Sequence, residues 1–297
     1  MSLELLEMDD LIRRLSNTSE ISFVFGSALT GRKNDIGILE PDGVVDFVQN
    51  RMYEAGYKEP FDNYLAKDAD VIKYQAAFEF VARNYGADEI HRIINDIVSL
   101  NIDPQTGRQR IPKSVKDLVK SVKDNKLNVK YIITTNFDTL IEDALSEENI
   151  PYNSISIVSD SPINENANDL LTILHIHGVW NSGDTMHTRK QLSQRRLKIE
   201  ESIRNILENH TICMMAYGGW EDSLTRTLLG IMNNHKFNYS LIWCFYSSQD
   251  LDINKKYGNL SETYRDAISR ERIHFYKGID CNLIFDTLNK EELRPKK

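Results

Sequence analysis

Short runs of apolar residues alternate along much of the chain with longer segments whose apolar residues recur every three or four positions. The short runs are typical of buried strands, and the longer recurrence is typical of amphipathic helices. The pattern predicts strands at residues 21–25, 129–134, 152–158, 170–175, 211–216, 239–246 and 273–276. It predicts helices at residues 3–15, 42–53, 71–84, 87–100, 114–124, 137–146, 189–209, 224–233 and 261–269. Strands separated by helices indicate an α/β chain with a Rossmann-like doubly wound, mainly parallel sheet.

Residues from about 50 to 125 depart from this alternation. Three helical patterns follow one another there, and no convincing strand separates them. We therefore expect a Rossmann-like domain formed by residues 1–49 and 126–297, with a helical insertion at residues 50–125.

Composition narrows the class of protein. The net charge of −8 disfavours a nucleic-acid surface, which needs clustered Lys and Arg. The basic stretch at 189–198 is interpreted as a solvated helix face. No apolar run reaches the ~20 residues that span a bilayer, and the acidic N-terminus lacks the features of a signal peptide. Cys213, Cys244 and Cys281 form no zinc pattern and indicate a reducing, cytoplasmic compartment.

Small residues follow the first predicted strand, at Gly26-Ser27-Ala28. A glycine and small side chains let backbone N–H groups approach a phosphate closely. A plain turn is the alternative interpretation.

Paired glycines, Gly218 and Gly219, follow the strand at 211–216 and also suit close approach to a nucleotide. A plain loop is again the alternative. Glu221 and Asp222 come next, and we interpret both as caps of the following helix.

Asn136 and Asp138 lie at a strand-to-helix junction. We expect Asn136 to hold a water or a ribose hydroxyl, and Asp138 to accept a hydrogen bond from a carboxamide. The alternative is that Asn136 only caps the following helix.

His175 and His177 close another predicted strand, before Gly178. Residues two apart on a strand face the same side, so we expect both imidazoles to face one cleft. A neutral imidazole near pH 7 can accept a proton from a hydroxyl or a water. Buried structural histidines are the alternative.

Taken in order over roughly residues 20–280, these motifs resemble the sirtuin family, which has a glycine-small-residue loop, an Asn-x-Asp and a His-Gly after successive strands. The resemblance implies that Asn136 contacts the nicotinamide ribose, that Asp138 holds the nicotinamide amide and that His177 is the catalytic base. It implies further nucleotide contacts from Gly26, Ser27, Ala28, Thr135, Gly218 and Gly219.

Three departures refine the resemblance. The chain lacks the four zinc cysteines of deacylating sirtuins, Thr135 replaces their usual Gln, and Ala28 replaces a usual glycine. The pattern is instead similar to the zinc-free sirtuin-like domains of bacterial antiphage systems, which hydrolyse NAD to nicotinamide and ADP-ribose.

That resemblance implies an NAD glycohydrolase with Asn136 and His177 as its catalytic residues, NAD as its substrate and no zinc. It also implies control by a sensor or activator protein, supplied by a separate chain or a removed C-terminal region, within a homo- or hetero-oligomer. We expect no direct binding to nucleic acid or membrane. The alternatives are an NAD-dependent protein deacylase, a non-catalytic NAD or ADP-ribose sensor, and a generic nucleotide-binding domain.

Overall fold

A computed structural model describes residues 2–67, 72–163, 170–217, 222–232, 234 and 236–291. It contains one eight-stranded sheet in the order β1-β8-β7-β6-β2-β3-β5-β4, in which every neighbouring pair is parallel. The strands are β1 (Leu5–Leu6), β2 (Ile21–Phe25), β3 (Val129–Thr134), β4 (Tyr152–Ser156), β5 (Leu171–His175), β6 (Thr211–Met215), β7 (Ser240–Cys244) and β8 (Ile273–Tyr276). The predicted α/β class and parallel sheet are confirmed.

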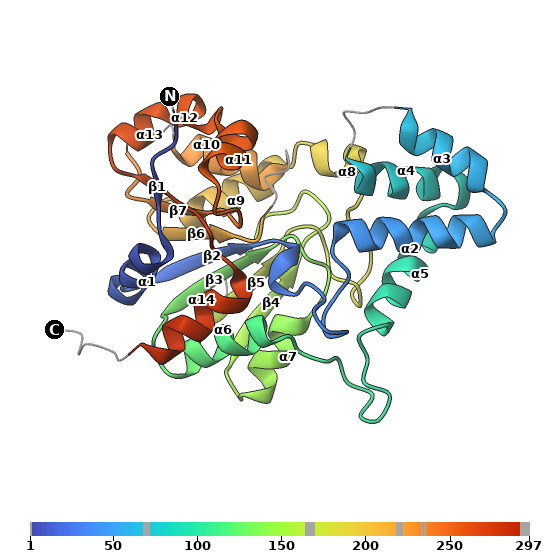
Figure 1. Cartoon of the computed structure of the whole chain (residues 1–297), viewed down its shortest axis with the longest axis horizontal. Coiled ribbons are helices and arrows are strands. Elements are labelled where there is room, and N and C mark those ends of the chain that lie inside the picture. The colour runs from blue at the N-terminus through green and yellow to red at the C-terminus, as the bar shows by residue number, and fades with distance from the viewer. Residues whose placement is uncertain are drawn as a thin grey trace.

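Helices connect these strands and cover both faces of the sheet (Figure 1). They are α1 (Met8–Asn17), α2 (Pro41–Glu54), α3 (Lys58–Ala66), α4 (Lys73–Tyr85), α5 (Ala87–Ser99), α6 (Lys113–Lys123), α7 (Leu140–Glu147), α8 (Arg189–Ser193), α9 (Leu197–Leu207), α10 (Ser223–Met232), α11 (Asp250–Tyr257), α12 (Leu260–Thr263), α13 (Arg265–Ser269) and α14 (Cys281–Lys290), with a 3₁₀ turn η1 at Ser27–Leu29. Within the described ranges, none of these helices has the length and apolarity needed to cross a membrane.

Alternation along the strands divides the core into two layers. Phe23 and Phe25 of β2 point to a layer formed with α1, α6, α7 and α14. Val24, between them, points to the opposite layer, formed with α9, α10 and α13. This division follows from the period of two in a strand, which sends successive side chains to opposite faces.

A third apolar cluster joins α2, α3, α4 and α5 into a helical unit beside the carboxyl edge of the sheet (Figure 1). Phe61 and Phe78 are fully buried in it. Helix α2 therefore packs with this unit, whereas α6 packs on the sheet against α14. The division at residues 50 and 125 stays a prediction.

Three of the predicted helices are wrong in extent, one of them because residues 261–269 belong to two helices, α12 and α13, that are separated at Tyr264. Leu5–Leu6 pair with Phe275 and Tyr276 as the edge strand β1, so the first helix begins only at Met8. The predicted helix at 189–209 is two helices, because Gln194 adopts an extended conformation with ψ 134° between them.

Strand order creates a reversal at the centre of the sheet. From β2 the chain continues to β3 on one side and later returns to β6 on the other. In open parallel sheets, ligands bind beyond the carboxyl ends of the strands at such a reversal. The carboxyl ends of β2 and β6 are therefore the expected position of a site.

Candidate active site

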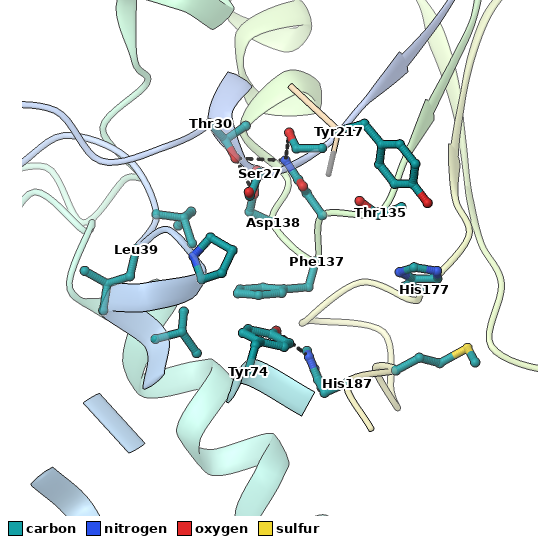
Figure 2. A pocket seen from close by; sticks show the side chains of 16 residues that line it. Ser27, Thr30, Leu39, Tyr74, Thr135, Phe137, Asp138, His177, His187 and Tyr217 are labelled. Carbon is teal, nitrogen blue, oxygen red and sulfur yellow. Dashed lines mark hydrogen bonds between the residues drawn. The ribbon is translucent and has the colours of Figure 1, made fainter. Parts of the chain in front are cut away.

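A cavity of about 150 Å³ lies where the carboxyl edge of the sheet meets the helical unit (Figure 2). The segments after β2, β3 and β5 form one side, with Gly26, Asn136 and His177. Leu39, Val44 and Tyr74 form the opposite side. Residues more than 100 positions apart in the sequence thus converge on one cavity.

Gly26 lies at the reversal point, against the end of β6. A Cβ atom there would stand 2.2 Å from the carbonyl oxygen of Ala216. Ala216 itself has a positive φ of 57°, which turns the chain sharply as it leaves β6. A glycine at position 26 is therefore needed for the two strand ends to approach each other.

Asn136 is held by a network that leaves one polar atom for a ligand. Its Nδ2 amide donates to the carbonyl of Gly26 at 3.1 Å and to Oγ1 of Thr30 at 3.0 Å. Both amide hydrogens are then used, so the group that Asn136 can offer to the cavity is the acceptor Oδ1.

The capping alternative for Asn136 is wrong. The following helix, α7, begins only at Leu140, its N-cap residue is Thr139, and the amide of Asn136 bonds to Gly26 and Thr30 instead. Asp138 supplies that contact, because its Oδ1 accepts from the backbone N–H of Leu140 at 3.2 Å.

Thr30 connects the two residues of the Asn-x-Asp motif. Its hydroxyl accepts from Asn136 and donates to Oδ2 of Asp138 at 2.8 Å (Figure 2). Asp138 is buried at the cavity wall, and burial raises its pKa to about 6 despite the hydrogen bonds from Thr30 and Leu140.

The two histidines do not share a cleft. His177 lines the cavity, whereas the ring of His175 is buried between the backbone carbonyl of Asn136, at 2.9 Å, and Oε1 of Glu142, at 2.6 Å. The prediction failed because β5 ends at His175 and residues 176–177 form a turn, where the alternation of a strand no longer holds.

His175 instead fixes the loop that carries Asn136. Both of its ring nitrogens face acceptors, so both carry hydrogen. Burial lowers the pKa of His175, but Glu142 outweighs burial and raises it above the ordinary value. The result is a buried imidazolium that holds the Asn136 carbonyl in place.

His177 packs beside a buried carboxylate. Its Nε2 lies 3.3 Å from Oδ2 of Asp222, within ion-pair distance, yet the geometry is not that of a hydrogen bond and Nε2 has no other partner. We interpret His177 and Asp222 as neighbours that form a hydrogen bond after a small rotation of the imidazole ring. Because Nε2 faces Asp222, Nδ1 is the other ring nitrogen through which His177, a residue of the cavity lining, can contact a ligand.

An aromatic wall that the motifs did not reveal completes the cavity. Tyr74 and His187 are joined through the tyrosine hydroxyl and Nδ1 at 2.7 Å, and Phe137 lies edge-on to His187 (Figure 2). Burial lowers the pKa of His187 to about 3, so this imidazole is neutral. The only sequence feature that could have indicated this wall was Tyr74 on the apolar face of an amphipathic helix. Such a position is equally typical of a residue that packs in the core.

The remaining predicted contacts divide between two cavities. Thr135 and Ser27 line the first, and Ser27 and Ala28 line an adjoining cavity of about 530 Å³ over the ends of β6 and β7. Gly218 and Gly219 lie outside the described residues.

Nothing in the described ranges resembles a metal centre, since no group of three His, Cys, Asp or Glu side chains is placed to hold an ion. The cysteines are buried and free, and burial raises the pKa of Cys281 to about 12. Such thiols are poor nucleophiles.

Comparison with known proteins gives a partial match. Residues 130–265 match the family model of a SIR2-like domain. A Sir2 homologue in complex with NAD is similar to this chain, with a TM-score of 0.43 and 8% identity over 98% of this chain and 95% of that one. A mutant Sir2 homologue in complex with ADP-ribose has a TM-score of 0.43 and 10% identity, and the match covers 95% of each chain.

Proposed function

We propose that this chain hydrolyses NAD to nicotinamide and ADP-ribose. The observation that carries the proposal is the convergence of Asn136 and His177 on one cavity at the reversal point of the sheet. The SIR2-like match at residues 130–265 supports a nucleotide of this class, since the solved structures named above hold NAD and ADP-ribose.

The dimensions of the two cavities suit the two parts of the substrate. A cavity of about 150 Å³ is large enough for a single aromatic ring. Phe137 gives the nicotinamide an apolar surface, and Asp138 offers an acceptor for its carboxamide. The adjoining cavity of about 530 Å³ is assigned to the adenosine part.

The reaction breaks the bond between the ribose C1′ and the nicotinamide nitrogen. The bonding electrons pass to the nitrogen and neutralise its positive charge, which makes nicotinamide a good leaving group. The sugar becomes oxocarbenium-like, as in glycoside hydrolysis, and the oxygen of a water forms the new bond to C1′. One proton of that water must be removed.

Two residues divide these tasks. Oδ1 of Asn136 accepts a hydrogen bond from the water or a ribose hydroxyl and orients it. Nδ1 of His177 accepts the proton, because Nε2 faces Asp222. Both residues are buried, and the low dielectric around them strengthens both interactions.

Nicotinamide release from NAD by the purified chain tests the proposal. Asn136→Ala and His177→Ala should each reduce kcat by about 10²–10⁴-fold while the fold is retained. Asn17→Ala and His91→Ala, at exposed helical positions, are the matched controls and should keep wild-type turnover. Retention of more than about a tenth of wild-type activity by both site variants contradicts the assignment.

The assay separates the alternatives. NAD binding without nicotinamide release favours a sensor, whereas release that requires an acylated lysine peptide favours a deacylase. Following the resemblance in the sequence, we propose that the hydrolase is a cytoplasmic antiphage effector controlled by a partner protein in an oligomer. Release only in extract from phage-infected cells supports that role, and equal release by the isolated chain contradicts it.

A further inference from the structure

Asp222 is a fully buried carboxylate with two separate sets of contacts. Its Oδ1 accepts from the backbone N–H groups of Leu224, at 2.9 Å, and Thr225, at 3.0 Å. These are first-turn groups of α10, so the cap expected from the sequence is present. The cap uses only Oδ1, so Oδ2 of Asp222 can make contacts elsewhere.

The second oxygen faces the active site. Oδ2 accepts from the hydroxyl of Tyr217 at 2.8 Å and lies 3.3 Å from Nε2 of His177. Burial would raise the pKa of Asp222, but His177, the Thr225 N–H and Tyr217 outweigh it and hold the pKa below its ordinary value. The group next to the catalytic imidazole is therefore an ionised carboxylate.

A buried arginine from a third segment ties the two groups together. Arg196 donates from Nη1 to the carbonyl of Ile176 at 2.8 Å and from Nε to Oγ of Ser223 at 3.2 Å. Those two residues are the chain neighbours of His177 and Asp222. Because Arg196 is 2% exposed, its interpretation as part of a solvated helix face is wrong. Its position fixes the separation of the two side chains.

We propose that Asp222 is the positioning residue of His177. The proposal rests on the proposed hydrolysis of NAD and assigns a partner to its base. The carboxylate holds the hydrogen on Nε2, so that Nδ1 is the basic nitrogen toward the cavity, and it stabilises the imidazolium that forms when Nδ1 takes the proton.

A second explanation of Asp222 is that it only caps α10. Asp222→Asn separates the two, because the amide oxygen can still cap the helix while the neutral amide no longer supports an imidazolium. Asp160 is a matched control, since its Oδ1 accepts from the N–H groups of Lys198 and Ile199 at the start of α9 without touching a histidine. Asp160→Asn makes the same chemical change at a simple cap.

We expect Asp222→Asn to lower kcat for nicotinamide release by about 10²-fold, with little change in KM. The split between kcat and KM matters, because a group that only shapes the cavity would change substrate binding and therefore KM as well. The other ionisable groups around the pair are Tyr217, Arg196 and His187. The Tyr217 hydroxyl loses its acceptor Oδ2 in this variant, whereas Arg196 and His187 keep the hydrogen bonds described above. Asp160→Asn should match wild type in both measurements.

Two further measurements complete the test. In a His177→Ala background, Asp222→Asn should cost nothing more, because a positioning residue acts only through its partner. The ring nitrogen chemical shifts of His177, measured by NMR in wild type and Asp222→Asn, report which nitrogen carries the hydrogen and need no turnover. Loss of the hydrogen from Nε2 in the variant supports the pair even if the chain does not hydrolyse NAD, so the two proposals can fail separately.

The proposal is overturned if Asp222→Asn keeps wild-type kcat, or if it loses activity while the His177 ring keeps its hydrogen on Nε2. An equal additional loss in the His177→Ala background also overturns it, since that result indicates a contribution unrelated to the imidazole.

Discussion

The hydroxyl of Thr30 holds two residues of the candidate site in place. It accepts from Asn136 and donates to Asp138, and the side chain is 1% exposed. The direction of the first bond turns the amide hydrogens of Asn136 away from the cavity and leaves Oδ1 as its acceptor. The direction of the second keeps Asp138 anchored at the wall. The chemistry proposed for Asn136 therefore depends on a residue that does no chemistry.

We predict that Thr30→Val lowers the free energy of unfolding by about 1–3 kcal/mol, because a buried donor and a buried acceptor both lose their partner. The amide of Asn136 is then free to turn, and kcat should fall by at least about tenfold, since a small misplacement of a positioned group can cost ~10²-fold. Urea unfolding and nicotinamide release measure the two effects.

Thr227→Val is the control for this change. Thr227 is also buried, and its hydroxyl donates to the carbonyl of Ser223 at 2.7 Å within α10. Both variants should be destabilised, but only Thr30→Val should lose activity beyond its effect on stability. Equal activity of the two variants would show that the Thr30 bridge does not orient Asn136.

At the scale of elements, the sequence predicts what depends on local pattern. Seven of the strands were expected, because short β-branched and aromatic runs bounded by polar residues are specific to buried strands. Strand β1 was not, because Leu5–Leu6 fit a helical pattern and only pairing with β8 makes them a strand. Helix α14 was missed although Ile284, Phe285 and Leu288 follow helical spacing.

In the candidate site too, the sequence predicts what depends on local pattern and not what depends on contacts between distant segments. Strand ends predict the positions of Asn136 and His177, because parallel strands deliver their carboxyl ends to one edge. Tyr74, His187 and Asp222 could not be predicted as neighbours of that edge. Their contacts join the helical unit, a loop and a cap, and nothing in a local pattern specifies which distant segments will meet.

The close approach of β2 and β6 gives a prediction at this scale. In Gly26→Ala, the new methyl group would stand 2.2 Å from the Ala216 carbonyl, so the two strand ends must separate. We expect a loss of about 1–3 kcal/mol in the free energy of unfolding, typical of overpacking. NAD binding, measured by calorimetry, should also weaken, because both cavities lie at this junction.

Gly230→Ala is the matched control for the added methyl group. A Cβ there has no atom within 4 Å, and the residue lies inside α10. Replacing a helical glycine by alanine should stabilise the chain by up to about 1 kcal/mol. If Gly26→Ala binds NAD and unfolds like wild type, the strand ends can separate without consequence, and the proposed role of this glycine is wrong.

At the scale of the whole molecule, the cavity lies between two apolar cores. The sheet contributes Asn136, Asp138 and His177, and the helical unit contributes the opposite wall (Figure 1). Enclosure of this kind buries ionisable groups, and a buried ionisable group makes the stability of the folded chain depend on pH. Asp138 is the clearest case.

Asp138 should make the folded chain less stable as pH rises. Burial raises its folded pKa from 3.8 to about 6, so between those values the folded chain keeps a proton that the unfolded chain has lost. Its contribution to stability is therefore greatest below the unfolded pKa and declines as pH rises through about 6, by roughly 3 kcal/mol in total.

Asp138→Asn cannot ionise and should remove this dependence. The free energy of unfolding of the variant, minus that of wild type, should increase by roughly 3 kcal/mol between about pH 4 and about pH 7. Any lost hydrogen bond adds a constant offset and leaves this slope unchanged. Asp124 is a control in which the pH dependence should be reversed, because its hydrogen bond from Lys120 lowers its pKa. The free energy of unfolding of Asp124→Asn, minus that of wild type, should therefore fall as pH rises. A flat difference for Asp138→Asn would mean that this carboxylate is solvated, and the buried cavity wall on which the proposed chemistry depends would then be exposed to water.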